Sequence, residues 1–171
     1  MITIQLEDCN SFSQDIYDTV INHLQFHQMK CKCGRIGCLI LYGHYKRHLK
    51  LLCAFICLII QRVRCTNCGR THSLIPSLVV PYSQIPRKDQ QEILELSEAD
   101  KSPGPVLERN NLIDENNVKH VIRRFRQHWK ERIKSIGRTL SDSLTEPCLS
   151  TYSRQFMQIH RTWNIFFPPP T

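Results

Sequence analysis

Cysteines gather at two places in this chain, with a spacing typical of metal ligands. The first group is Cys31-Lys-Cys33-Gly34-Arg-Ile-Gly37-Cys38, and the second is Cys65-Thr-Asn-Cys68-Gly69. A structural Zn²⁺ takes four thiolate or imidazole ligands in a tetrahedron, and two short loops can supply two ligands each. A glycine directly after a ligand lets the chain turn around the metal without Cβ strain. The pattern therefore predicts a zinc ribbon that holds one structural Zn²⁺.

The second cysteine group has two cysteines for two ligand positions, whereas the first group has three cysteines for two positions. Cys65 and Cys68 have the ordinary separation of a zinc-binding loop, and Cys33 is the third predicted ligand. The fourth ligand is open between two cysteines. Cys38 has an ordinary spacing from Cys33, whereas Cys31 would make a tighter bite on the metal. Free or disulfide-bonded cysteines are the alternative to a metal site.

Two further cysteines have a different expected role. Cys53 and Cys57 lie in the apolar run 51–60, where cysteine behaves as a small buried hydrophobe. We predict that both pack in the core. The chain has nine cysteines, an odd number. Without an export signal, this count indicates a reducing compartment and thiolate–metal chemistry rather than a disulfide framework.

The length of 171 residues is enough for one ordinary domain or two small ones. No N-terminal stretch combines a basic start, a long apolar middle and a small-residue cleavage site, so we expect no secretory signal. The longest apolar run, 51–60, has ten residues, whereas a membrane-spanning helix needs about 20. We expect a cytoplasmic protein that does not associate with membranes.

Positive charge is concentrated in two blocks. The net charge is +8; residues 30–72 hold nine Lys and Arg and no acid, and residues 119–138 carry a net +7. Each block coincides with a candidate structural module, as expected of a protein that binds a polyanion through two basic surfaces. A merely solvated surface is the alternative, but solubility alone does not explain two unmixed blocks.

Hydrophobic periodicity predicts an α+β protein that begins with a small β domain. At the start of residues 1–29, apolar and polar residues alternate, which predicts a short strand. A helix that starts at Ser11 or Ser13 is predicted to follow. Residues 30–83 form the zinc ribbon, with two or three strands between residues 39 and 64 and Gly43 near a turn or bulge. Prolines beyond Thr71 exclude a helix and favour an extended connector.

A three-helix, helix-turn-helix-like domain is predicted over residues 84–137. Its helices cover about 87–98, a short segment that starts at Pro105, and a long segment that Asp114 caps and Gly137 ends. Residues 138–171 form a C-terminal tail with an apolar and aromatic end. We favour packing of this tail against the helices over a role in partner binding.

The long third helix carries two stripes. Its apolar stripe consists of Val118, Val121, Ile122, Phe125, Trp129, Ile133 and Ile136. A cationic stripe lies about 100° away, which is the division that a recognition helix in the major groove needs. The candidate DNA contacts are Lys119, Arg123, Arg126, Lys130 and Lys134 on this stripe, Asn116 and Asn117 in the first turn, and Lys46 and Arg47 in the ribbon. For the two asparagines, helix capping is the alternative that we favour over reading adenine.

A longer motif around the second cysteine group carries a family resemblance. It runs Gly43-His-Tyr45-Lys46-Arg47 and then Arg62-Val-Arg64-Cys65-x-x-Cys68-Gly69-x-Thr71-His72-x-Leu-Ile-Pro76-x-Leu-x-x-Pro81-Tyr82. It resembles an uncharacterised zinc-binding family associated with bacterial insertion sequences and transposase-like proteins. The resemblance implies a zinc ribbon followed by a helix-turn-helix that binds double-stranded DNA for a mobile element. A separately encoded recombinase is then a second candidate partner, and His72 is a reserve metal ligand.

Two other classes of protein compete with a DNA-binding module. A transposase of the three-carboxylate type needs an RNase H-like core that holds two Mg²⁺, and the 88 residues after residue 83 are predicted to be helical. No Gly-x-Ser-x-Gly elbow and no paired catalytic carboxylates are present, so we expect no catalytic activity. The other class is a zinc-stabilised adaptor whose basic blocks meet an acidic protein partner.

Overall fold

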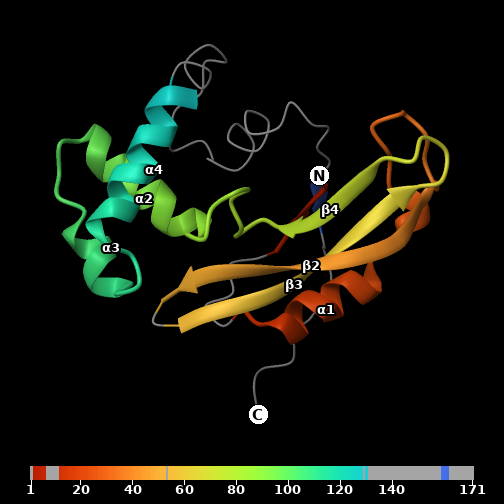
Figure 1. Cartoon of the computed structure of the whole chain (residues 1–171), viewed down its shortest axis with the longest axis horizontal. Coiled ribbons are helices and arrows are strands. Elements are labelled where there is room, and N and C mark those ends of the chain that lie inside the picture. Colours follow the sequence, from red (N-terminus) through yellow and green to blue (C-terminus); the bar gives the residue numbers. More distant parts are fainter. Residues whose placement is uncertain (1, 7–11, 53, 129, 131–158, 162–171) are drawn as a thin grey trace.

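The computed structural model describes residues 2–6, 12–52, 54–128, 130 and 159–161 (Figure 1). The elements in chain order are β1 (Ile2–Gln5), α1 (Gln14–His23), the 3₁₀ helix η1 (Phe26–Gln28), β2 (Leu39–Leu51), β3 (Ala54–Cys65), β4 (Thr71–Pro76), α2 (Arg87–Glu98), α3 (Gly104–Arg109), α4 (Glu115–His128) and β5 (Ile159–Arg161). The predicted α+β class is confirmed. None of the helices in these ranges has the length and apolar character that crossing a membrane requires.

The strands form one mixed sheet in the order β2-β3-β4-β1-β5. β2 and β3 make a long antiparallel hairpin, and β4 pairs antiparallel with the last part of β3. β1 runs parallel to both β4 and β5. The first strand of the chain therefore lies inside the sheet, and parallel pairing with β4 requires the long connection through α1 and the hairpin.

The hairpin is regular except for one bulge. Its pairing runs from Leu39 opposite Cys65 to Leu51 opposite Ala54, and the register shifts between Leu41 and Gly43. Gly43 has a φ of +154°, a value that residues with a Cβ rarely adopt. The predicted bulge or turn at Gly43 is therefore confirmed, and Tyr42 is the extra residue on the bulged strand.

The far part of the hairpin is only half buried, which corrects one prediction. Leu58 and Ile60 are buried, whereas Cys57 is exposed. Successive side chains of a strand point to opposite faces, so an apolar run of this length need not be buried on both sides. The prediction that Cys57 packs in the core is wrong, and Cys53 lies outside the described residues.

Helix α1 closes an open edge of β3. Ser13 caps the helix by accepting from the Ile16 backbone N–H, as one of the two predicted caps. Gln14 accepts from the Ile59 backbone N–H at 2.7 Å. The Tyr17 hydroxyl accepts from the Gln61 N–H at 2.9 Å and donates to the Leu74 carbonyl at 2.8 Å. Side chains of α1 thus satisfy backbone groups where β4 has left the sheet edge.

The segment after the second cysteine group is a strand and not merely a connector. β4 is extended, as its prolines predict, but it pairs with β3 on one side and with β1 on the other. Ser77 then bonds the backbone of Leu6, accepting from its N–H at 3.1 Å. This pairing unites residues 1–29 and the predicted ribbon in one hydrophobic core.

Helices α2, α3 and α4 surround a second core. The predicted helix over 87–98 is confirmed by α2, and the short helix near Pro105 by α3. Asp114 caps α4 by accepting from the Asn117 backbone N–H at 2.7 Å. On α4, the buried members of the predicted apolar stripe are Val118, Val121 and Phe125. The helix-turn-helix arrangement stays a prediction.

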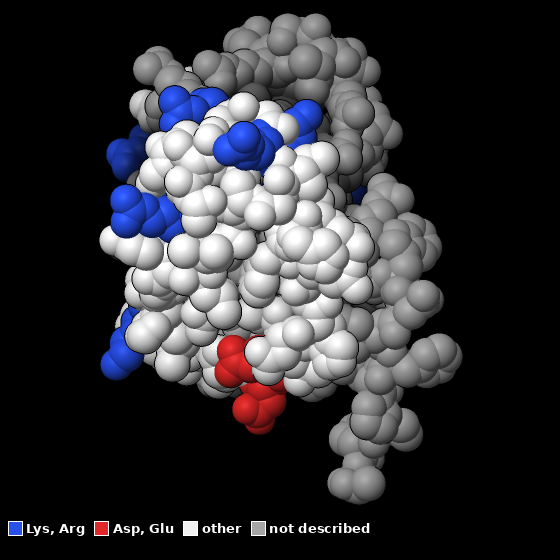
Figure 2. Space-filling model, turned by 90° about the vertical axis from the view of Figure 1, so that its right-hand side faces the viewer, with Lys and Arg blue, Asp and Glu red and all other residues white. Residues whose placement is uncertain are grey.

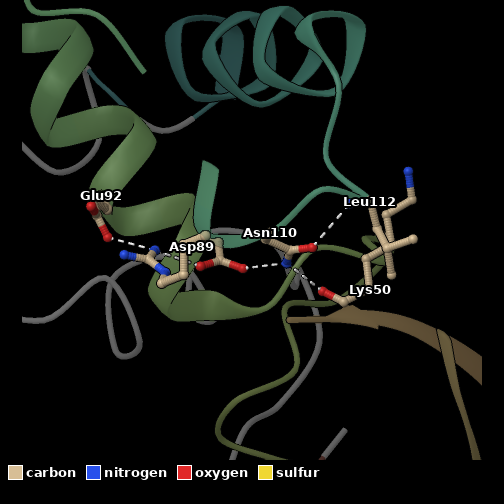
Figure 3. Close-up of polar contacts among 6 residues, drawn as sticks. Lys50, Asp89, Glu92, Asn110 and Leu112 are labelled. Carbon is tan, nitrogen blue, oxygen red and sulfur yellow. Dashed lines mark hydrogen bonds and ion pairs between the residues drawn. The ribbon is translucent and has the colours of Figure 1, made fainter. Parts of the chain in front are cut away.

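A polar joint fastens these helices to the turn end of the hairpin (Figure 3). Asn110 is fully buried. Its amide nitrogen donates to the Lys50 carbonyl and to the Asp89 carboxylate, both at 2.9 Å, and its amide oxygen accepts from the Leu112 N–H at 3.3 Å. Arg109 donates to Asp89 at 2.8 Å and to Glu92 at 2.7 Å. The joint therefore links β2, α2 and the end of α3 through partnered polar groups.

Several predictions fall on parts of the chain outside the described residues. They concern Trp129, Ile133, Lys134, Ile136 and the end of the third helix at Gly137. Of the predicted C-terminal tail, the structure describes only β5, which pairs with β1.

Candidate metal centre

Each cysteine group folds as a tight loop, here called a knuckle. In the second knuckle, the Gly69 N–H donates to the Cys65 carbonyl at 3.0 Å and the Cys65 N–H donates to the Arg70 carbonyl at 2.8 Å. In the first, the Gly34 N–H donates to the Cys31 carbonyl and the Cys31 N–H to the Arg35 carbonyl, both at 2.9 Å.

The two knuckles share a pattern that differs in length by one residue. Both end in Cys-Gly-Arg, and both glycines have positive φ, +90° at Gly34 and +69° at Gly69. The hydrogen bonds of the first knuckle enclose one residue fewer, because Cys31 and Cys33 have a single residue between them. The Cys31–Cys33 spacing is therefore a shortened version of the Cys65–Cys68 spacing, and both turns depend on glycine.

The knuckles bring four sulfur atoms together. The Sγ atoms of Cys31, Cys33, Cys65 and Cys68 all lie within 4.8 Å of one another. Cys31 and Cys68 are 3.6 Å apart, and Cys33 and Cys65 are 3.8 Å apart. A tetrahedral thiolate site with metal–sulfur bonds of about 2.3 Å has sulfur–sulfur edges of about 3.8 Å. Two of the six edges are near this length and none exceeds 4.8 Å, so the four sulfurs could surround one tetrahedral metal ion.

The geometry selects between the two candidates for the fourth ligand. Cys31 belongs to the four-sulfur group, whereas Cys38 does not. Cys38 is buried beside the group, with its Sγ 3.3 Å from the Cys65 Sγ and 3.3 Å from the Arg35 carbonyl. The His72 Nε2 lies 3.3 Å from the Cys31 Sγ. Cys38 and His72 thus contact two of the grouped sulfurs from outside.

The pKa values of the thiols at the cluster are shifted in opposite directions. Burial raises the pKa of Cys31 to about 12 and also raises the pKa of Cys38. Burial opposes ionisation of Cys65 too, but the N–H groups of Cys68 and Asn67 and the Cys38 thiol lower its pKa to about 6. The Arg35 backbone N–H lowers the pKa of Cys33. Thiolates are the ligand form of cysteine, so two sulfurs of the cluster are primed to bind a cation.

His72 is held neutral at physiological pH. Burial and the nearby charges of Arg70 and Lys32 lower its pKa to about 4. A neutral imidazole can donate one N–H to a thiolate sulfur. His72 can therefore support Cys31 as a hydrogen-bond donor.

Two of the predicted DNA contacts of the third helix pair with acids, one on α4 itself and one on α2. Lys119 lies 3.5 Å from Glu115, and Lys130 lies 2.8 Å from Glu98. Arg123 contacts His120 at 3.2 Å. Arg126 and Asn116 are exposed.

Two of the predicted contacts make hydrogen bonds near the joint, between the hairpin and the part of the chain that follows β4. Asn117 accepts from the Lys50 ammonium at 2.6 Å and donates to Asp114 at 2.7 Å. Arg47 is half-buried and donates to the carbonyls of Val80 and Ser83, both at 2.7 Å. We therefore assign these two side chains to contacts within the chain. Lys46, in contrast, is exposed.

A comparison with protein families found one match, and it includes both knuckles. Residues 30–105 match the model of a domain of unknown function, DUF6431. This range holds both knuckles, the strands β2 to β4 and α2, and it ends before α4 begins. A search of curated proteins and a search of solved structures each found no match.

Proposed function

We propose that this chain is a zinc-stabilised protein that binds double-stranded DNA. The observation that carries the proposal is the four-sulfur cluster built into the most basic segment of the chain, residues 30–72. Four thiolates in a tetrahedron suit Zn²⁺ or an iron–sulfur cluster. The edges of 3.6 and 3.8 Å suit a single ion of the size of zinc.

The zinc ion would have a structural role. It would tie the chain before β2 to the junction of β3 and β4, because Cys31 and Cys33 precede β2 whereas Cys65 and Cys68 flank that junction. All four ligands come from the chain, which leaves no open coordination position for a substrate or water. Metal binding and folding of this end of the sheet are then linked.

The helical unit supplies a candidate surface for duplex DNA. α4 buries Val118, Val121 and Phe125 and leaves Arg123 and Arg126 exposed. This division supports α4 as a recognition helix, with arginine side chains that reach phosphates or guanine edges. An association with a bacterial mobile element rests on the sequence resemblance alone, and so does a separately encoded recombinase as partner.

A zinc-stabilised adaptor for another protein is the second candidate. The observation in its favour is a set of exposed apolar side chains near the knuckles, among them Ile36 and Leu41, which are 61% and 56% exposed. Exposed apolar patches are common at protein interfaces. A protein partner would have to be acidic to complement residues 30–72.

Binding of duplex DNA by the metal-loaded chain tests the proposal. We expect the full-length protein, purified with zinc, to bind a fluorescent 20-base-pair duplex at about 0.15 M salt, with affinity that falls as salt rises. Removal of zinc by a chelator should abolish binding, and restoring zinc should recover it. Absence of binding by the zinc-loaded protein, or binding that chelation leaves unchanged, would contradict the proposal.

A further inference from the structure

Five side chains form a surface beside the metal cluster, here called the knuckle patch. They are Arg35, Tyr42, Arg62, Arg64 and Arg70, which lie on the first knuckle, the bulge of β2, the end of β3 and the second knuckle. The knuckles are at the right-hand end of the molecule in Figure 1. Seen from that end, Lys and Arg lie over the upper part and along one side, while the acidic side chains in view lie at the lower edge (Figure 2).

Three of the patch arginines are oriented by neutral groups. Arg35 donates to the Asn67 side chain at 2.8 Å, and Arg62 donates to the Thr71 hydroxyl at 3.0 Å. The Arg64 guanidinium lies 5.1 Å from the centre of the Tyr42 ring. Within the described part of the chain, no carboxylate lies within ion-pair distance of these three arginines. Arginine has five N–H donors, so each keeps donors for an external anion.

Two lysines among the predicted DNA contacts differ in this respect. Lys119 and Lys130 each have a carboxylate partner, Glu115 and Glu98 respectively. A phosphate would have to compete with these carboxylates, whereas at the knuckle patch it would meet oriented guanidinium groups. Guanidinium binds phosphate oxygens in a fork geometry that lysine lacks. Anion binding is therefore favoured at the knuckle patch over these two lysines, whereas Arg123 and Arg126 of α4 are exposed arginines like those of the patch.

The bulge adds an aromatic surface to the patch. Tyr42 is the extra residue at the register shift, and it is 52% exposed beneath Arg64. Arginine and tyrosine side chains both bind the phosphates and sugars of duplex DNA. This combination of arginine and tyrosine fits a DNA backbone better than a simple anion.

The length of the hairpin sets the distance between the knuckle patch and α4. The first turn of α4 contacts β2 at Lys50, through Asn117, and the knuckles lie at the other end of β2, next to Leu39. Arg62 and Arg64 of the patch stand opposite Gly43 and Ile40, seven and ten residue steps from Lys50, which is roughly 23 and 33 Å at about 3.3 Å per residue. One turn of B-form DNA is about 34–36 Å long, so both contacts fall within one turn.

We infer that the knuckle patch is a second DNA contact, which binds phosphates within one helical turn of the site of α4 on the same duplex. This inference rests on the proposed function. It assigns backbone contacts to the arginines of the patch, and it makes the hairpin a spacer between the two contacts. The joint at Asn110 and Lys50 then fixes the spacing.

A different role for the arginines is to balance charge at the metal. Zn²⁺ with four thiolates carries a formal charge of −2, and cations beside it lower the energetic cost of that charge. Loss of the arginines would then weaken zinc binding and leave DNA affinity unchanged. DNA affinity and zinc content measured on the same variants separate the two roles.

The test replaces Arg62 and Arg64 together. We expect Arg62→Ala/Arg64→Ala to keep one zinc per chain and to bind the 20-base-pair duplex roughly 30-fold more weakly at 0.15 M salt. Each lost phosphate contact should lower the slope of log affinity against log salt by about 0.9. The pair Lys88→Ala/Lys101→Ala removes the same charge from exposed positions at either end of α2 and should change neither quantity. Arg62→Lys/Arg64→Lys keeps the charge without the fork geometry and should restore only part of the affinity.

A short duplex tests the spacing. An 8-base-pair duplex is about 27 Å long at 3.4 Å per base pair, which is too short to extend from Lys50 to Arg64, roughly 33 Å away along the hairpin. We expect the native protein to prefer 20 base pairs over 8 by a larger factor than the Arg62→Ala/Arg64→Ala variant does. Equal affinities of this variant and the Lys88/Lys101 control would overturn the inference, and so would loss of zinc without loss of DNA binding. Failure of the native protein to bind the longer duplex would instead remove the proposed function.

Discussion

Replacement of Asn110 by alanine should loosen the joint between the hairpin and the helices. The Asn110 side chain is fully buried and makes three hydrogen bonds, two from its amide nitrogen at 2.9 Å and one to its oxygen at 3.3 Å. A neutral hydrogen bond contributes about 1 kcal/mol to stability and one to a carboxylate about 2 kcal/mol. The three bonds therefore total about 4 kcal/mol.

Part of this loss should be recovered in the variant. Asp89 keeps its ion pair with Arg109 at 2.8 Å, and the bond from the Leu112 N–H is already long. We therefore expect the free energy of unfolding to fall by about 3 kcal/mol. For a chain of this size, that loss corresponds to a decrease in Tm of about 6–12 °C.

Circular dichroism during urea and thermal unfolding measures this loss, and the neighbouring asparagine provides the control. Asn111 is exposed and makes no side-chain hydrogen bond within the described part of the chain, so Asn111→Ala should change stability by less than about 0.5 kcal/mol. Zinc content should stay the same in both variants, because the knuckles lie at the other end of β2. A loss below about 1 kcal/mol for Asn110→Ala, or equal losses for both variants, would refute the reasoning about the joint.

Three further predictions concern the sheet edge, the metal ligands and α4. Tyr17→Phe removes a buried hydroxyl that bonds two backbone groups, so the free energy of unfolding should fall by about 2 kcal/mol in urea titrations. Cys31→Ser should lose the metal in elemental analysis, whereas Cys38→Ser should retain it, because only Cys31 belongs to the four-sulfur group. Arg123→Ala/Arg126→Ala should weaken duplex binding and lower its salt slope by about 1.8 without changing the circular dichroism spectrum.

Each of these predictions has a matched comparison. Tyr82→Phe alters an exposed tyrosine and should leave stability unchanged; a loss as large as that of Tyr17→Phe would contradict the account of the sheet edge. Metal loss from Cys38→Ser with retention by Cys31→Ser would reverse the assignment of the fourth ligand. The Lys88→Ala/Lys101→Ala pair again controls for charge, and equal DNA binding by it and the α4 variant would exclude α4 as a DNA contact.

Local patterns predicted the elements of this fold well. The boundaries of α2 follow from Pro86 and from the apolar positions Ile93 and Leu94, and the start of α4 follows from Asp114. The bulge at Gly43 also has a local cause, since its φ is one that glycine tolerates. Such features are determined by residues that are close together in the sequence, so a single sequence is enough to predict them.

Pairing between distant segments was much harder to predict. The parallel contact of β1 with β4 joins residues about 70 positions apart. The alternating apolar residues Ile2 and Ile4 predict a strand, but the same pattern occurs in edge strands and in central strands, so it does not identify the neighbouring strands. The exposure of Cys57 has the same origin, because an apolar run does not indicate which face of a strand is covered. The roles of Arg47 and Asn117 near the joint depend on partners elsewhere in the chain.

The candidate metal centre was predicted in part. The second knuckle was unambiguous, because Cys65-x-x-Cys68-Gly69 has one arrangement of ligands. The first knuckle has three thiols, and spacing alone favoured neither Cys31 nor Cys38. The repeated Cys-Gly-Arg ending and the matching backbone bonds of the two loops identify Cys31 as the equivalent of Cys65. That repetition was present in the sequence and would have resolved the choice.

The central claim is that four cysteines hold one zinc ion, and X-ray absorption at the zinc edge tests it most directly. Protein purified without chelator should contain one equivalent of zinc, surrounded by four sulfur atoms at about 2.3 Å. This result would match the group of Cys31, Cys33, Cys65 and Cys68. A nitrogen ligand at about 2.0–2.1 Å would indicate that His72 binds the metal in place of a thiolate. Protein without zinc, or zinc with fewer than four sulfur neighbours, would contradict the account.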